Sequence, residues 1–526
     1  MRPLGLSFAV VLLAAISLLC VQLQGFADDP GIGWHLATGQ WISEFKEIPA
    51  QDKFLFSKTE IGAKAHTWLP EQWLADLILF QIYKFGSWPA LYSFGAVVYL
   101  ATFIFIVYPT LLRSSRSYLY TALVTLLVFK LGQIHFILRP VLFNYPLFAL
   151  VLSLCVAPRE KIVLLRKYLL ILVPLLFALW ANLHPAFVFG LILIFFRILA
   201  ETLNQRWWSV PADWRYQKTL LLILLLSFLG TLINPYGYQL YAHIAWHSES
   251  LVVSRLFTEW QAINLKEYAG TLLLASAALV IFAFIFTKSL NAFYFLSFML
   301  FFPWAASTAR VLPFYALACA PLFIQGLVGL QECLMRSLLF KFPKLVYYLG
   351  NLERLEQRAI RGYSLCLAIL LWVSLTTVLT GTTPGVLEYG PSSKKMPVEA
   401  VRYLNAQMPS RAASSNDGQK DRSPQSLKVM NDIDWGGYLT LAGNGKVQAY
   451  IDDRAAMLGD SFIEQYLEAL KPTGGWESFI RASGAHYLLL RQSDPLNIAI
   501  ESKQLWPAVY RDQLAIVYKI TRNHDQ

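Results

Sequence analysis

ADDPGIGWHLATGQWI, residues 27–42, directly follows the first apolar run of the chain and carries Asp28, Asp29, Trp34 and His35. A carboxylate at the mouth of a membrane helix lies on the boundary between water and hydrocarbon, where partial desolvation sets its pKa and its reactivity. Two acids, a Trp and a His in this place indicate more than a connecting loop. We interpret the stretch as the reactive end of a helical membrane protein.

The composition places the chain among polytopic membrane proteins. Its 526 residues are 56% hydrophobic and 15% charged, and the mean hydropathy of +0.47 is too high for a soluble protein of ordinary composition. Lys and Arg on cytoplasmic loops explain the net charge of +11, so we expect no nucleic-acid partner. The five cysteines lie at irregular spacings, which indicates neither a disulfide framework nor a metal knuckle.

The apolar runs predict about eleven membrane spans, most of them near the roughly 20 residues that a bilayer requires. The first run follows Arg2, and we expect it to remain as an uncleaved span; the alternative is a signal peptide cleaved near residues 25–27. The expected spans cover residues 4–23, 89–112, 117–136, 140–157, 168–183, 185–203, 218–234, 269–287, 290–304, 310–331 and 362–381.

The expected domains are a membrane domain at residues 1–384, a linker at 385–427 and a small α/β domain at 428–526. Alternate loops are rich in Lys and Arg, which places the first outer loop, residues 28–88, and the C-terminal domain outside the cytoplasmic membrane. Two further features are predicted, interfacial helices in the first outer loop and β-rich runs in the last domain. They are residues 40–42 and 69–85 for the helices, and 447–451, 486–490 and 515–520 for the runs.

Polar side chains at several span ends should meet on the outer face if this topology holds. Ionisable groups are costly at a membrane boundary, so several of them on one side suggest a site. Besides Asp28, Asp29 and His35, these groups are His135, Arg139, Asn182, His184, Asn234, Tyr236, His243, His247, Glu249, Glu259, Trp260 and Arg310.

Each group also has a structural explanation. Asp28 or Asp29 could cap a turn before Pro30, and Arg139 could extend its side chain to the interface. His184 could satisfy a broken helix junction and Glu259 could belong to an interfacial anchor. Arg310 opens a span on the outer side, against the charge rule, which favours a bound anion there.

Several known motifs are absent from the sequence. It has no H-E-x-x-H motif, and His243 with His247 has no obvious third ligand for a metal. It also has no P-loop, no Gly-rich dinucleotide turn and no G-x-S-x-G elbow. Nucleotide chemistry on the cytoplasmic side is therefore unsupported.

Eight motifs spread over nearly the whole chain carry a resemblance to a known family, namely DPGIGWHLATGQWI, LRPVLFNYPLF, LWANLHPAFVFG, NPYG, TEW, ARVLPFYALACAP, NDIDWGGYL and IDDRAAMLGD. With them the chain resembles the GT-C class of polyprenyl-phosphate-sugar-dependent glycosyltransferases, which includes the protein O-mannosyltransferase relatives. More closely, it is similar to a poorly characterised bacterial branch of that class with a soluble C-terminal domain. The implied fold is a GT-C-like helical membrane protein with a small extracytoplasmic α/β domain.

The resemblance implies transfer of a hexosyl or pentosyl group from a polyprenyl-phosphate donor to a glycan, lipid or protein acceptor. Asp28 or Asp29 would be the general base of an inverting attack, with His35 also a catalytic candidate. Arg310, or in second place Arg139, would bind the donor phosphate.

The resemblance leaves the remaining roles less defined. Glu259 and His184 would orient the acceptor or a metal, although His184 precedes Pro185 where relatives often have Gly. Trp34, Asn182 and Tyr236 are further candidates for substrate binding. A divalent ion, Mg²⁺ or Mn²⁺, stays open as a cofactor.

Two other classes of function compete with a transferase. A transporter would bind its solute near the membrane midplane and often has repeated halves, whereas the charges here gather at one face and no repeat is seen. A non-catalytic assembly protein could use the C-terminal domain to bind partners, because family resemblance does not prove activity.

Overall fold

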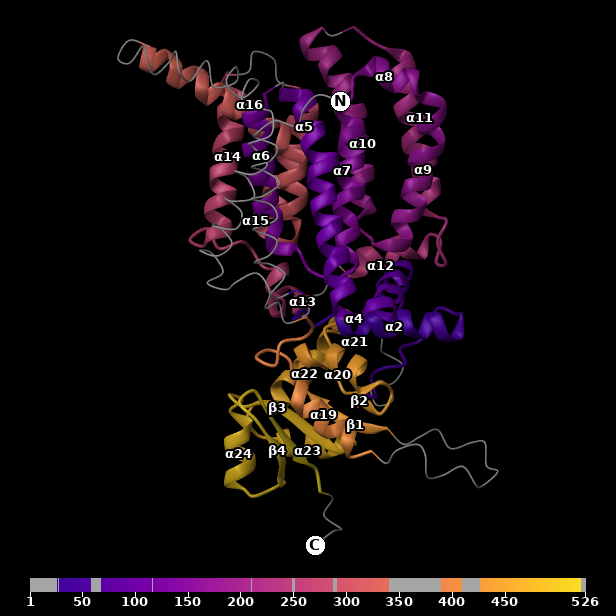
Figure 1. The fold of residues 1–526 in the computed structure, drawn as a ribbon, viewed down its shortest axis with the longest axis vertical. Helices are drawn as coiled ribbons and strands as arrows, with labels where there is room; N and C mark the ends of the chain where they lie inside the picture. Colours follow the sequence, from indigo (N-terminus) through magenta and orange to yellow (C-terminus); the bar gives the residue numbers. More distant parts are fainter. Residues whose placement is uncertain are drawn as a thin grey trace.

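The computed structural model describes residues 26, 28–57, 68–115, 117–209, 211–247, 251–286, 291–339, 389–408 and 426–521. It is an elongated molecule with a bundle of long helices at one end and a mixed α/β domain at the other (Figure 1). The first and last of the predicted spans, residues 4–23 and 362–381, lie outside the described residues.

Apolar helices that run roughly side by side along the long axis build the bundle (Figure 1). Their outward surfaces carry large exposed hydrophobic side chains, such as Leu175, Ile281 and Phe105, as expected where lipid replaces water. Among the described residues, five helical segments are long and apolar enough to cross a membrane, and two shorter apolar helices accompany them. The five are Trp73–Ser115, Arg166–Leu183, Phe187–Arg206, Tyr268–Phe286 and Ala309–Leu334, and the shorter two are Pro140–Cys155 and Ala292–Ser307.

The bounds of the helices show how the predicted spans correspond to elements. The longer helices of the bundle are α4 (Trp73–Ala101), α5 (Tyr108–Ser115), α6 (Tyr118–Gly132), α7 (Asn144–Cys155), α9 (Arg166–Leu183), α10 (Phe187–Trp208), α11 (Trp214–Thr231), α14 (Tyr268–Phe286), α15 (Ala292–Ser307) and α16 (Leu312–Leu339). Shorter elements join them, namely η2 (Thr102–Val107), η3 (Gln133–His135), η4 (Pro140–Phe143), α8 (Arg159–Leu164), α12 (Gln239–His247), α13 (Leu251–Leu256), η5 (Thr258–Trp260) and η6 (Ala309–Val311).

Helix α4 changes direction within its length. Gly86 and Ser87 have non-helical dihedral angles, and Pro89 follows them in the next turn, which is a common cause of a kink. The residues before the kink correspond to the interfacial helix predicted at 69–85, and those after it to the span predicted at 89–112.

The C-terminal domain contains a five-stranded sheet with strand order β2-β1-β3-β5-β4. Strands β1 (Leu427–Asn431), β2 (Val447–Ala449) and β3 (Tyr487–Arg491) are parallel to one another, while β4 (Ala508–Arg511) and β5 (Ala515–Lys519) are added antiparallel. The helices of this domain are α20 (Gly436–Gly443), α21 (Ala455–Leu458), α22 (Asp460–Ala469), α23 (Trp476–Ala482) and α24 (Leu496–Ser502).

One helix lies within residues 385–427, the range predicted as a linker. Helix α19 (Val398–Ala406) lies inside that range, and its Ala400, Val401 and Leu404 are buried in the hydrophobic core of the C-terminal domain. The helix is amphipathic, so its apolar side requires a partner surface. This part of the segment therefore belongs structurally to the soluble domain.

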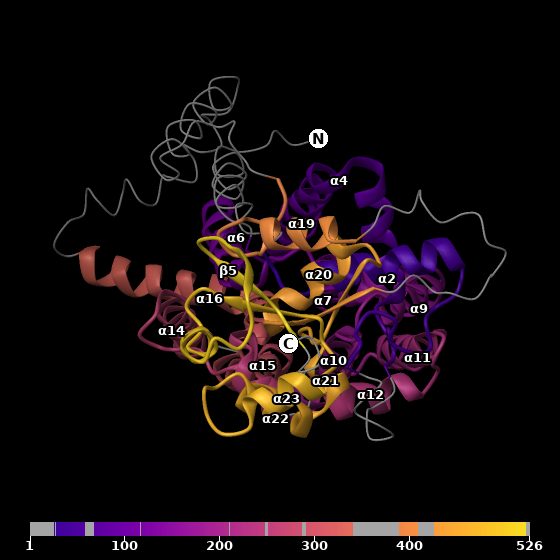
Figure 2. The same cartoon turned by 90° about the horizontal axis from the view of Figure 1, so that it is seen from below.

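Glycine contacts dock the C-terminal domain on helix α2 (Ile32–Phe45). A Cβ atom at Gly33 would lie 2.0 Å from the backbone oxygen of Gly437 in α20, and a Cβ at Gly437 would lie 2.2 Å from the backbone oxygen of Pro30. The first outer loop also continues the sheet, because the Phe56 amide donates to the Ala449 oxygen at 3.1 Å. Seen from the soluble-domain end, that domain covers the central part of the bundle (Figure 2).

We expect Gly33→Ala to loosen this docking, because the new methyl group must displace the α20 backbone. Overpacking of this kind costs about 1–3 kcal/mol. Thermal unfolding and limited proteolysis of the detergent-purified protein should show a lower midpoint and faster release of the C-terminal domain. Gly474→Ala is the control, since nothing lies within 4 Å of that Cβ position; equal effects of the two substitutions would contradict the docking role of Gly33.

Candidate active site

Arg139 bridges two carboxylates that come from opposite ends of the chain. Its Nε donates to Asp29 Oδ1, and its Nη2 donates to Asp453 Oδ2 at 2.6 Å. Two further donors complete the arrangement: the Gly31 amide bonds Asp29 Oδ1 at 2.9 Å, and Trp34 Nε1 bonds Asp453 Oδ1 at 2.8 Å. The bridge therefore joins the first outer loop, the bundle and the C-terminal domain at one point.

Local sequence explains why these groups can approach one another. The bond from the Gly31 amide to the Asp29 side chain closes a turn around Pro30, as Asp commonly does. Gly31 leaves the space that the guanidinium fills, because a Cβ there would lie 2.5 Å from Arg139 Nη2. Arg139 itself is extended, as the residue before a proline prefers to be, and Pro140 begins η4.

A second group of charges contains Glu259, which lies in η5. His135 Nε2 lies 3.0 Å from Glu259 Oε2, and Arg310 Nη1 lies 3.8 Å from Glu259 Oε1. The Arg310 guanidinium stacks over the Trp260 ring, 4.2 Å from its centroid. No described residue accepts a hydrogen bond from Arg310, so its donors remain available.

We call seven residues from these two groups the junction cluster. They interact electrostatically across the two groups, because Glu259 contributes to the raised pKa of Arg139 and Arg139 to the lowered pKa of Glu259. The junction cluster comprises Asp29, Trp34, His135, Arg139, Glu259, Arg310 and Asp453.

The pKa shifts of the two acids differ in direction. Burial raises the pKa of Asp453, and Arg139 only partly opposes this effect. Burial would also raise the pKa of Glu259, but Arg310, the His135 hydrogen bond and Arg139 together hold that pKa below its ordinary value. Glu259 therefore remains an anion over the physiological range, and its charge attracts the Arg310 guanidinium.

His184 and His35 lie beside the junction cluster as neutral side chains. Burial lowers the pKa of His184 to about 3, with Arg310 contributing. Its Nδ1 accepts from the Ala186 amide at 3.0 Å, which leaves the proton on Nε2. Burial also lowers the pKa of His35, and its Nδ1 lies 2.7 Å from Asp76 Oδ1.

Two other predicted site residues contact the same region without joining the junction cluster. Tyr236 donates to the Pro70 oxygen at 3.2 Å, and Asn182 accepts from Trp73 Nε1 at 2.9 Å. His243 lies 3.5 Å from Glu71, whose pKa falls to about 2 because the histidine outweighs the opposing effect of burial. These contacts fix the start of α4 against the neighbouring helix ends.

Asp28 points away from Arg139. Its Oδ1 accepts from the Ser392 amide at 2.9 Å, and its Oδ2 lies 3.5 Å from Lys395 Nζ. Adjacent acids thus have different surroundings: Asp28 holds the segment that leads into α19, and Asp29 belongs to the junction cluster.

Sequence reasoning did not single out the acids and the arginine that precede α21. Asp453 belongs to the junction cluster, while Arg454 pairs with Asp52 and Asp452 and stacks over Trp34 at 5.3 Å. Burial raises the pKa of Asp452 to about 6 against the effect of Arg454. The signal was present in the motif IDDRAAMLGD, but nothing in the motif reveals that it reaches helix α2.

The arrangement does not fit a divalent metal ion. No group of three or more His, Cys, Asp or Glu side chains with the arrangement of a metal site occurs within the described part of the chain. Asp29 and Asp453, the two acids that could share an ion, already share the guanidinium of Arg139. We therefore assign no chemical step to a metal.

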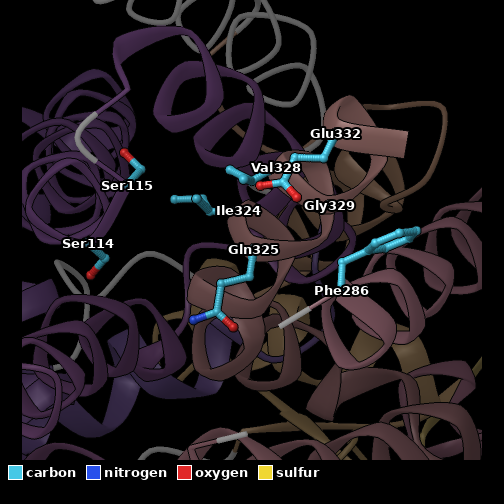
Figure 3. Close-up of a pocket in the computed structure, with 8 residues that line it drawn as sticks. All are labelled: Ser114, Ser115, Phe286, Ile324, Gln325, Val328, Gly329 and Glu332. Atoms are coloured by element: carbon cyan, nitrogen blue, oxygen red, sulfur yellow. The ribbon is translucent and has the colours of Figure 1, made fainter. Parts of the chain in front are cut away.

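A small cavity lies elsewhere in the bundle, away from the junction cluster. It has a volume of about 160 Å³ and lies between α5, α14 and α16, with Gln325 and Glu332 among its polar lining residues (Figure 3). Arg310 precedes the first turn of α16, whereas Glu332 lies in its last turns. The cavity is thus at the far end of the bundle from the C-terminal domain.

The comparisons with known proteins identify a shared fold. No protein-family model matches the chain, and no curated protein matches it. A structure of the archaeal oligosaccharyltransferase AglB from Archaeoglobus fulgidus, in complex with an inhibitory peptide and a dolichol-phosphate, superposes with a TM-score of 0.58 at 11% identity. The superposition covers 99% of this chain and 74% of the AglB chain.

A second structure of an oligosaccharyltransferase from the same organism, tethered to an acceptor peptide that contains the NVT sequon, has a TM-score of 0.56 at 11% identity. It covers 98% of this chain and 74% of that chain. The chain therefore shares the fold of these oligosaccharyltransferase structures, in agreement with its resemblance to the GT-C class.

The pKa of His184 leads to a prediction on stability. Because the pKa falls from 6.5 to about 3 on folding, the unfolded chain binds a proton more readily between these values, and acidification from pH 6.5 should destabilise the protein. The contribution is about 1.4 kcal/mol per pH unit. His184→Asn, whose oxygen can still accept from the Ala186 amide, should weaken this dependence in thermal unfolding between pH 7 and about 5.

The control is His486→Asn, because His486 also accepts a backbone amide through Nδ1 but is exposed. We expect this variant to keep the pH dependence of the wild type. Identical slopes for His184→Asn and the wild type would show that His184 is not the group responsible.

Proposed function

We propose that this protein is a membrane glycosyltransferase that moves a sugar from a polyprenyl-phosphate donor to an acceptor hydroxyl. The observation that carries the proposal is the environment of the Arg310 guanidinium. It stacks on the Trp260 ring, and the nearest acid, Glu259, lies 3.8 Å away. A largely buried guanidinium with unused donors suits a phosphate group, which can accept two parallel hydrogen bonds. The GT-C fold supports the same proposal.

Arg310 is better placed than Arg139 to bind the donor phosphate. Arg139 already donates to two carboxylates, and a phosphate would have to displace one of them. The neutral His184 would supply an additional donor through its Nε2 proton, since no described residue bonds that nitrogen. Arg310 contributes to the lowered pKa of His184, so the two side chains lie near each other.

Asp29 is the better candidate for the general base. Both bonds that it accepts, from Gly31 and Arg139, end on Oδ1, and no described residue donates to Oδ2. Asp28, in contrast, has both oxygens engaged, by Ser392 and Lys395. An acceptor hydroxyl at Asp29 Oδ2 would lie within the junction cluster, which also contains Arg310.

In the proposed reaction, the acceptor oxygen attacks the anomeric carbon of the donor sugar. Its proton passes to Asp29 Oδ2 as the new carbon–oxygen bond forms. The bond from the anomeric carbon to the phosphate oxygen breaks on the opposite face, with inversion, and polyprenyl phosphate leaves with its negative charge stabilised by Arg310. Glu259 keeps the Arg310 side chain oriented for this role.

The proposal also covers the orientation of the protein in its membrane and its place in the bacterial branch of the GT-C class. Helix α8 lies at the end of the bundle away from the C-terminal domain (Figure 1), and it contains Arg159. Arg166 and Lys167 begin α9 directly after it. These basic residues support placing the junction cluster on the extracytoplasmic side of a bacterial inner membrane. The acceptor, whether glycan, lipid or protein, would then approach from the side of the C-terminal domain.

We expect Asp29→Asn to abolish most of the transfer activity and Asp28→Asn to retain most of it. Loss of a general base lowers the rate by about 100- to 10,000-fold, whereas Asp28 contributes only to docking. The assay would follow sugar transfer from synthetic polyprenyl-phosphate donors to envelope extracts. Comparable losses in both variants would reject the assignment of the base, and no transfer by the wild type with any donor would favour a non-catalytic assembly protein.

We expect Arg310→Gln to lower kcat/KM for the donor by about 10- to 100-fold, the effect of losing charge-assisted hydrogen bonds. Arg159→Gln is the control, because Arg159 is paired with Glu201 at the other end of the bundle and is similarly shielded. Donor-dependent kinetics of the two purified variants would test this. An Arg310→Gln protein with wild-type kinetics would exclude a phosphate-binding role.

A further inference from the structure

We propose that the guanidinium of Arg139 takes the place of a divalent metal ion between Asp29 and Asp453, so that transfer needs no metal and depends on a carboxylate from the C-terminal domain. This inference rests on the proposed function. It assigns Asp453 as a positioning residue that acts through Arg139, and it makes the docked C-terminal domain a part of the site.

The first argument is that a cation already fills the space between the two acids. Arg139 donates to both carboxylates from different nitrogen atoms, as a planar guanidinium can do and a single ammonium group cannot. Gly31 packs against the same guanidinium so closely that a Cβ would lie 2.5 Å from Nη2. An ion could enter only if Arg139 moved out.

The second argument concerns the lone pairs that a metal would need. Asp29 Oδ1 accepts from the Gly31 amide, and Asp453 Oδ1 accepts from Trp34 Nε1 at 2.8 Å. Each acid therefore has a backbone or ring donor in addition to the guanidinium. These donors fix the carboxylates for hydrogen bonding rather than for coordination of a metal.

The third argument is that the neighbouring acids have partners of their own. Glu259 is engaged by His135 and Arg310, and Asp28 by Lys395. The described residues contain no group of three or more His, Cys, Asp or Glu side chains that could hold a metal ion. An ion here would therefore depend on the two acids that Arg139 already bridges.

It follows that Asp29 and Asp453 have different roles. Arg139 holds Asp29 by one oxygen, which leaves Oδ2 as the oxygen directed to the acceptor. Asp453 holds Arg139 from the other side, so Asp453 influences the orientation of Asp29 without touching the substrate. Because Asp453 lies on the C-terminal domain, undocking of that domain would disorganise the base.

A manganese titration of the purified full-length protein tests the inference. An ion that binds the folded state raises the unfolding temperature as its concentration increases. We expect no manganese-dependent stabilisation of the wild type, and transfer within about twofold of its normal rate in excess EDTA, since no bound ion contributes to the barrier. Arg139→Ala, which leaves two carboxylates without their cation, should gain stabilisation by manganese, and Arg139→Ala/Asp453→Asn should lose that gain.

The outcomes separate this inference from the proposed function. Transfer that stops in EDTA and returns with Mn²⁺ would overturn the inference, as would manganese stabilisation of the wild type that Asp453→Asn removes. If Arg139→Ala does not fold, the manganese titration of the wild type and its transfer rate in EDTA still test the inference. No transfer with any donor would reject the proposed function, while the titration would continue to test the bridge.

Donor kinetics of an Asp453 variant test the positioning role of this residue. We expect Asp453→Asn to lower kcat with little change in KM for the donor, because Arg310 rather than Asp453 contacts the donor phosphate. Asp494→Asn is the control, since Asp494 is a half-buried acid of the same domain that caps helix α24. A rise in donor KM with unchanged kcat would contradict the role.

Discussion

The ionic bridge from Asp29 through Arg139 to Asp453 is the interaction on which the rest of the structure depends. It joins a turn after the first apolar run, the extended residue before η4 and a loop that precedes α21. Charges in a partly buried place are costly unless they are paired and hydrogen-bonded, and here each carboxylate has a second donor. The bridge therefore specifies how bundle and domain fit together as much as it stabilises them.

Close backbone packing makes this bridge possible. Helices α2 and α20 approach through Gly33 and Gly437, which brings Trp34 within reach of the Asp453 side chain. Stacking of Arg454 over Trp34 and its pairing with Asp52 hold the same loop. The result is a group of partly buried charges that lies between the bundle on one side and the folded domain on the other.

The sequence predicts the helices and strands better than the contacts between residues that are distant in the chain. Hydropathy locates the long apolar helices of the bundle, and the runs at 447–451, 486–490 and 515–520 overlap β2, β3 and β5, because periodicity is a local property. Arg310 was singled out because a cation at an outer span end is unusual. The sequence does not reveal Asp453 because it lies 314 residues from Arg139. The choice between Asp28 and Asp29 depends on Ser392, which lies 364 residues from Asp28.

We propose one ligand site at the junction of the bundle and the C-terminal domain, with Arg310 as its phosphate contact and Asp29 as its general base. A cryo-EM structure of the protein in nanodiscs with polyprenyl phosphate tests it most directly. The account predicts phosphate density against the Arg310 guanidinium, with Asp453 still bound to Arg139. Phosphate at the far end of the bundle, or bound at Arg139 in place of Asp453, would contradict it.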